Sequence, residues 1–142
     1  MAYYQILLQY ILFFGFAFSL VLAVAQIIRK KPELTNYLNT AIFFCNGVIQ
    51  LGIFLIALKI PEQQPLSIFL FLTSIFIIGP LLLFYSYALF NSSASQTGFP
   101  KMLMAHLVPG FLVFMGEIVF QFQPAEYKRS IIDVALNGHE WN

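Results

Sequence analysis

Apolar residues run along the chain in four long blocks separated by short polar turns. The blocks cover residues 6–28, 38–58, 66–90 and 102–122, and only the last contains a histidine and an acidic residue. A helix needs about 20 apolar residues to cross about 30 Å of hydrocarbon. Because an unpaired backbone polar group in lipid costs several kcal/mol, such runs form helices. The pattern predicts an all-α polytopic membrane helix bundle with four transmembrane helices within residues 1–123.

Residues 124–142 change to a mixed pattern of polar and apolar positions. Tyr127, Ile131 and Val134 recur at helical spacing. The polar side is supplied by Glu126, Lys128, Arg129 and Asp133. This amphipathic pattern predicts a short interfacial C-terminal helix, ended by the Asn-Gly pair at residues 137–138.

Composition supports a lipid environment. Hydrophobic residues make up 60% of the chain and charged residues only 9%, whereas soluble domains carry about 25% charged residues. The net charge of +1 gives no electrostatic basis for nucleic-acid binding. A single cysteine, Cys45, excludes a disulfide within the chain and a cysteine-rich metal site.

Basic residues near the spans predict the orientation, because they are retained in the cytoplasm. One side of the membrane has Arg29, Lys30, Lys31 and Lys101. The opposite side has Lys59, Lys128 and Arg129. Since three of the first group are consecutive at a helix end, we expect the N-terminus outside. Signal-peptide cleavage stays open for the first run, because residues 23–25 (Ala-Val-Ala) are similar to a cleavage site.

Two ionisable side chains lie inside the fourth run. Glu117 follows His106 by eleven residues, close to three helical turns, so both project from one face about 16 Å apart. An opposite helix is expected to meet both. One interpretation is a proton-linked or ligand-reading face. The interpretation that we favour is structural, with both groups reaching toward water or pairing with a neighbouring helix.

The first two runs carry small and polar residues at helical spacing. Asn46 and Gln50 share one face of the second run, where amides join helices by hydrogen bonds, and a ligand contact is the alternative. Gly15, Ser19 and Ala23 form a stripe of small residues that favours close helix packing. Together with the two ionisable groups, the amides are expected to form a polar interior.

Two proline-glycine pairs predict breaks in the third and fourth helices. Gly79-Pro80 should kink the third helix in mid-membrane, because proline removes a donor and crowds the carbonyl of Phe76. Pro109-Gly110 should break the fourth helix just past its histidine. These four residues are the candidate hinges.

The motifs of enzymes are missing from the sequence. It has no glycine-rich phosphate loop, no serine or cysteine beside a histidine base, and no pair of neighbouring carboxylates within the apolar runs. The two histidines, His106 and His139, are too few for a histidine-rich metal cluster. We expect no catalytic residue, cofactor or metal ion.

The third and fourth runs carry a family resemblance. Residues 78–90 (Ile-Gly-Pro-Leu-Leu-Leu-Phe-Tyr-Ser-Tyr-Ala-Leu-Phe) are similar to a G-P-L-L-Y-hydrophobic-Y stretch in the membrane-embedded N-terminal region of certain bacterial AraC-type transcription regulators. In that family, a polar loop leads to a helix opening with H-hydrophobic-hydrophobic-P, which residues 106–109 (His-Leu-Val-Pro) resemble. The basic turn at residues 29–31, before a span with polar Asn39, is also similar.

The resemblance implies a sensor region in the bacterial inner membrane that relays a signal to a C-terminal helix-turn-helix domain. The sequence ends at Asn142 without that domain, so we expect residues 124–142 to be the truncated start of a longer chain, with no nucleic-acid contact by this segment. Its expected partners are the lipid bilayer and further membrane helices or a second copy. Two alternatives stay open: a small four-span transporter subunit acting as an oligomer with Glu117 as coupling carboxylate, and a non-catalytic membrane scaffold.

Overall fold

The computed structural model describes residues 2–31, 33–60, 70–91 and 99–137, and these ranges contain helices and no strand. The elements are α1 (Ala2–Ile27), α2 (Leu34–Ala57), α4 (Phe71–Phe90), α6 (Lys101–Met104), the 3-10 turn η2 (Ala105–Leu107), α7 (Val108–Gln121) and α8 (Ala125–Asn137). The all-α prediction is confirmed, with four long apolar helices and a shorter C-terminal one.

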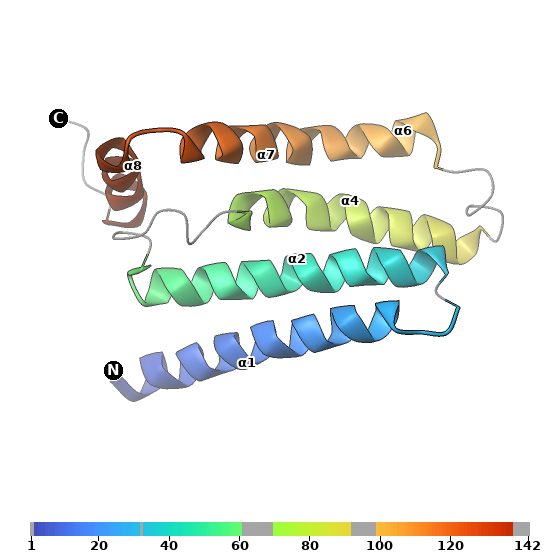
Figure 1. The fold of residues 1–142 in the computed structure, drawn as a ribbon, viewed down its shortest axis with the longest axis horizontal. Coiled ribbons are helices and arrows are strands. Elements are labelled where there is room, and N and C mark those ends of the chain that lie inside the picture. The colour runs from blue at the N-terminus through green and yellow to red at the C-terminus, as the bar shows by residue number, and fades with distance from the viewer. Residues whose placement is uncertain (1, 32, 61–69, 92–98, 138–142) are drawn as a thin grey trace.

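The four long helices lie side by side in one row. Figure 1 shows α1, α2, α4 and the α6–η2–α7 segment in chain order, each running opposite to the one before it. The contacts that hold the row together join α1 to α2, α2 to α4, and α4 to α7. The beginnings of α1 and α4 and the ends of α2 and α7 therefore lie at one end of the row, where α8 also packs. We call this the α8 end.

Each helix of the row is long and apolar enough to cross a membrane. The four segments are Tyr3–Ile27, Leu34–Ala57, Phe71–Phe90 and Lys101–Gln121. At a rise of 1.5 Å per residue, even the 20-residue α4 extends about 30 Å, the thickness of the hydrocarbon core. By the length and composition of these helices, the chain is a membrane protein.

Large apolar side chains cover the outside of the row. Among the described residues, the buried apolar side chains are those of Ala23, Phe84 and Ile132. The buried polar ones are Ser19, Asn36, Thr73 and Ser74. Phenylalanines, leucines and isoleucines are exposed along every long helix. In water this surface would be strongly unfavourable, whereas lipid tails solvate it, and the polar groups turn inward to find partners.

The second helix begins earlier than the apolar run that predicted it. α2 starts at Leu34, four residues before residue 38. The side chain of Asn36 accepts a hydrogen bond from the Glu33 N–H (2.9 Å) and donates one to Oε1 of Gln26 on α1 (2.9 Å). These two bonds stabilise a first turn that contains polar residues. The prediction missed this turn because it counted only the uncharged apolar run.

α1 also begins four residues before its predicted run, at Ala2, and the ends of the long helices differ from the predicted ends by at most one residue. α4 begins at Phe71, one residue after Leu70, which has a left-handed φ of 68°. The predicted third span also included residues 66–69, which lie outside the described residues. α8 ends at Asn137, as predicted, and residue 138 lies outside the described part.

The two proline-glycine pairs have different effects. α4 continues as one helix through Gly79 and Pro80, and the kink expected there, a change of direction within the helix, stays a prediction. The fourth helix is interrupted, because η2 separates α6 from α7 just before Pro109. A proline at position 109 cannot donate to the carbonyl of Ala105, and the chain tightens there into a 3-10 turn. In α4, Pro80 likewise lacks a backbone N–H, but the backbone hydrogen bonds before and after it keep the segment one helix.

α8 presents a different face to the row than the sequence pattern indicated. Ile132 is buried, and Ile131 and Ala135 line a cavity beside it, whereas Tyr127 is exposed. The predicted apolar stripe was centred on Tyr127, Ile131 and Val134. The inward face is rotated because α8 lies across the ends of α2 and α7, and the surface that it meets there selects Ile132 (Figure 1).

The antiparallel row makes a topological prediction. Reporter domains fused before α1 and after α8 should report the same side of the membrane, and a reporter inserted between α1 and α2 the opposite side. Alkaline phosphatase and green fluorescent protein fusions measure this directly. Opposite sides for the first two fusions would show that one of the four helices does not cross the membrane.

Candidate functional site

The carboxylate of Glu117, on α7, reaches across to the first turn of α4. Oε1 accepts hydrogen bonds from the backbone N–H groups of Leu72 (2.9 Å) and Thr73 (3.4 Å). Oε2 accepts one from the Thr73 hydroxyl (2.5 Å). Leu70, at the N-cap position, has no polar side chain to cap the helix. Glu117 therefore serves as the N-cap of α4, supplied from another helix.

This arrangement satisfies both partners. The first turn of a helix leaves N–H groups without intrahelical acceptors, and lipid offers none. The carboxylate, costly in a membrane on its own, lies at the positive end of the α4 dipole and accepts three hydrogen bonds. A structural role thus explains why an acidic residue lies inside an apolar helix: Glu117 joins α7 to α4.

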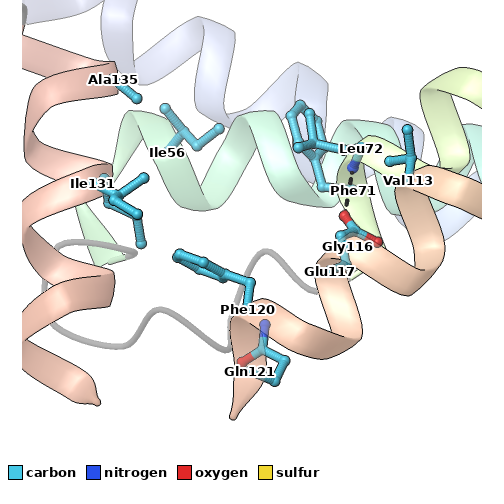
Figure 2. A pocket seen from close by; sticks show the side chains of 11 residues that line it. Ile56, Phe71, Leu72, Val113, Gly116, Glu117, Phe120, Gln121, Ile131 and Ala135 are labelled. Carbon is cyan, nitrogen blue, oxygen red and sulfur yellow. Dashed lines mark hydrogen bonds between the residues drawn. The ribbon is translucent and has the colours of Figure 1, made fainter. Parts of the chain in front are cut away.

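A cavity of about 510 Å³ lies next to this contact. Figure 2 shows it between α2, α4, α7 and α8, with Glu117 beside Leu72 at one side and α8 at the other. The described lining residues are Ile56, Phe71, Leu72, Val113, Gly116, Glu117, Phe120, Gln121, Ile131, Ile132 and Ala135. All but Glu117 and Gln121 are apolar or glycine, so among the described lining residues Glu117 is the one acid and the Gln121 amide the one other polar side chain.

A second hollow lies further along the α4–α7 pair, away from α8. It has a volume of about 440 Å³, and we call it the proline groove. Its described lining residues are Phe76, Gly79, Pro80, Leu83, His106 and Pro109. Three of the four candidate hinge residues therefore lie together, on two helices, with His106 beside them. The fourth, Gly110, is buried against Ile77 of α4.

His106 and Glu117 both contact α4, at different places. Glu117 bonds the start of α4, whereas His106 lines the proline groove with Gly79 and Pro80. The opposite helix expected to meet both is thus α4. The 3-10 turn at His106 turns the chain by about 120° per residue instead of about 100°, which rotates its side chain relative to the face of Glu117.

The amides of α2 point toward α1. Asn46 donates a hydrogen bond from Nδ2 to Oγ of Ser19 (3.0 Å). The amide of Gln50 lies over Gly15, where a Cβ atom would overlap it. Nearer the start of α2, the Thr40 hydroxyl lies 3.3 Å from the carbonyl oxygen of Ala23, the third small residue of the stripe on α1. The stripe and the amides thus form one α1–α2 contact.

The expected single polar interior is therefore wrong in its arrangement. Asn46 and Gln50 face α1, and Glu117 and His106 face α4. The reason is the row: α2 and α4 lie between these two sets of contacts, and each polar group is satisfied by the neighbour on its own side. Ala23, the last member of the small-residue stripe, is buried in the α1–α2 contact.

Several residues of these contacts were missed by sequence reasoning. Thr73 and Ser74 are both buried, Thr73 against Glu117 and Ser74 as the hydrogen-bond partner of Cys45 on α2. Gly52 lets Phe71 of α4 pack so close to α2 that a Cβ atom would overlap its ring. The sequence feature that could have indicated the contacts of α4 is the Thr73-Ser74 pair, near the start of an otherwise apolar run.

Chemically, the α8 end offers one carboxylate oxygen with spare acceptor capacity beside an apolar cavity. Among the described residues, no three His, Cys, Asp or Glu side chains are grouped to hold a metal ion. Comparison with known proteins found no matching family model, no similar curated protein and no similar solved structure. The fold and these two hollows are therefore the basis for a functional proposal.

Proposed function

We propose that the chain is the membrane-embedded sensor region of a transcription regulator of the AraC type. It lies in the bacterial inner membrane with the N-terminus outside, and a signal alters the packing of its helices. This segment itself does not contact DNA. The observation that carries the proposal is the proline groove, where the Gly79-Pro80 step of α4 faces the interrupted helix at His106 and Pro109.

The α4–α7 pair combines a firm half with a weak half. At the α8 end, the Glu117 cap holds the two helices together, and the contact of Gly110 with Ile77 lies at the border of the proline groove. At the proline groove, both helices lack a backbone hydrogen bond at neighbouring positions, and a hollow replaces side-chain packing. A rearrangement confined to the weak half leaves the other helix contacts of the row intact. A sensor needs such a part, which changes between two arrangements while the rest of the fold is kept.

The transporter alternative receives less support. A transporter site is alternately reached from both sides and lies near the middle of the membrane. Glu117 lies one turn before the end of α7, at the α8 end, and its charge is explained by the cap of α4. The scaffold alternative does not explain why the two proline steps face one another.

The first test is the size of the native product. A tag placed at the N-terminus at the chromosomal locus, followed by blotting of the membrane fraction, should give a band well above 16.2 kDa. A band near 16.2 kDa would contradict the proposal, since a regulator needs a DNA-binding domain.

Pro80→Ala should then alter transcription without loss of membrane insertion. Alanine restores the hydrogen bond to the Phe76 carbonyl, and about 1 kcal/mol changes a two-state population about fivefold. RNA sequencing should show overlapping sets of altered transcripts in Pro80→Ala and deletion strains. Leu89→Ala, at an exposed position of the same helix, is the matched control and should resemble the unaltered strain. A Pro80→Ala profile identical to that of Leu89→Ala would count against the hinge.

A further inference from the structure

The cavity at the α8 end has the size and lining of a site for a small apolar ligand. Its volume of about 510 Å³ falls in the range of small-molecule pockets, about 300–1,000 Å³. Side chains from four helices line it, and α8 forms the side at the end of the row (Figure 2). A strongly polar ligand would leave its groups unpaired against these walls, at a cost of about 2–7 kcal/mol for each such group. The main body of the ligand must therefore be aliphatic or aromatic.

The wall of the cavity also specifies one polar group. An ionised carboxylate has about four acceptor positions, and α4 occupies three of them at Glu117. The position that remains is on Oε2, because Oε1 accepts from two N–H groups and Oε2 from the Thr73 hydroxyl. A ligand that meets Glu117 must present a donor.

The charge of that donor follows from the surroundings of Glu117. Among the described lining residues there is no lysine, arginine or histidine. Lys59, Lys128 and Arg129 lie at the same end of the row, but none of them is among the described lining residues, and the Nζ of Lys128 donates to the carbonyl oxygen of Gln121 (3.0 Å). The α4 dipole and three hydrogen bonds stabilise the carboxylate, yet no lining cation balances its charge. A cationic donor makes a charge-assisted bond, about twice as strong as a neutral one.

We propose that this cavity binds an alkylammonium ligand, an aliphatic chain among the apolar walls with a protonated amine hydrogen-bonded to Oε2 of Glu117. The site lies apart from the proline groove and does not depend on the proposed sensor function. Since Glu117 also caps α4, the occupied site adds a bond to the group that joins α4 to α7.

The test measures binding of radiolabelled dodecylamine to the full chain in phosphatidylcholine nanodiscs at pH 7, by equilibrium dialysis against empty nanodiscs. We expect saturable binding of one amine per chain above the partitioning into lipid. Dodecanol, with the same chain and a neutral donor, should compete at least about tenfold more weakly. Dodecyl sulfate should not compete.

Three variants locate the site. Glu117→Gln should weaken amine binding at least about tenfold, while leaving an amide oxygen to cap α4. Gly116→Leu should abolish binding by filling the cavity, since a Cβ atom at Gly116 meets open space and the variant needs no repacking of neighbouring helices. Glu33→Gln removes an exposed carboxylate at the opposite end of the row and should bind as the unaltered chain does.

Three results would overturn the proposal. One is equal affinity for dodecanol and dodecylamine together with unchanged amine binding by Glu117→Gln, which would make the cavity an unselective site for lipid chains. Another is amine binding by Gly116→Leu at full strength, which would place the amine elsewhere. The third is absence of saturable amine binding to the unaltered chain. None of these results bears on the size of the native product, so the sensor proposal is tested separately.

Discussion

Glu117→Ala is expected to lower the free energy of unfolding of the protein by about 3 kcal/mol, because each of the groups that it leaves unpaired costs about 1–3 kcal/mol. The substitution removes the acceptor of the Leu72 and Thr73 N–H groups and of the Thr73 hydroxyl. Neither Leu70 nor the lipid replaces it. The measurement is reversible unfolding in mixed micelles with increasing sodium dodecyl sulfate, followed by circular dichroism.

Two further variants separate the parts of this contact. Glu117→Gln keeps an acceptor for the Leu72 N–H and should cost about 1 kcal/mol, the net value of one hydrogen bond. Thr73→Val removes only the hydroxyl and should cost about the same. In a double-mutant cycle, Glu117→Ala and Thr73→Val should be coupled by about 0.5–3 kcal/mol, as expected for residues in contact. Additive effects, or a stable Glu117→Ala protein, would show that Glu117 does not cap α4.

Gly110→Ala is expected to destabilise the α4–α7 pair by about 1–3 kcal/mol, the usual cost of overpacking a tight contact. A Cβ atom at position 110 would overlap Cγ1 of Ile77, and the Ile77 backbone follows closely behind at 3.7 Å. The overlapping atom is next to the Ile77 branch point, and a β-branched side chain in a helix has one strongly preferred χ1 rotamer, so relieving the overlap needs an unfavourable rotamer or a shift of the helix. The same unfolding measurement detects the loss.

Gly116→Ala is the matched control for this substitution. Gly116 lies on the same helix, and a Cβ atom there has no neighbour within 4 Å. Replacing a helical glycine by alanine at an open position stabilises by about 0.5–1 kcal/mol. Opposite signs for the two glycines would confirm that position 110 is a point of close helix contact. Equal effects would contradict the packing of α7 on α4.

These expectations change the role of one candidate hinge. The sequence pattern paired Gly110 with Pro109 as a flexible step, but the structure buries Gly110 against α4. Glu117 pairs with a neighbouring helix, as the favoured structural interpretation expected, and its carboxylate has one acceptor position left. In both cases the residue type marked the position as unusual within an apolar helix, and the contact with α4 decided its role.

Much of the architecture was readable from local pattern alone. All four predicted spans end within one residue of the observed helix ends, and three of them begin within four residues of the observed beginnings, because an uncharged run of about 20 residues has no alternative to a helix in lipid. Two of the boundaries that differ are made by polar bonds between segments. Asn36 extends α2 backward through its bond to Gln26, and α4 begins at Phe71, where Glu117 supplies the cap.

The sequence by itself thus determined the number of spans, the antiparallel order that short turns impose, and which polar and small residues lie inside the apolar helices. Only the tertiary structure decided which helix each of them meets. Lipid solvates every apolar face equally, so hydrophobic periodicity does not tell a helix which side to turn toward its neighbours. Close contacts at Gly15 and Gly110, and hydrogen bonds such as Asn46 to Ser19 and Glu117 to α4, make that choice. Those contacts depend on pairs far apart in the chain.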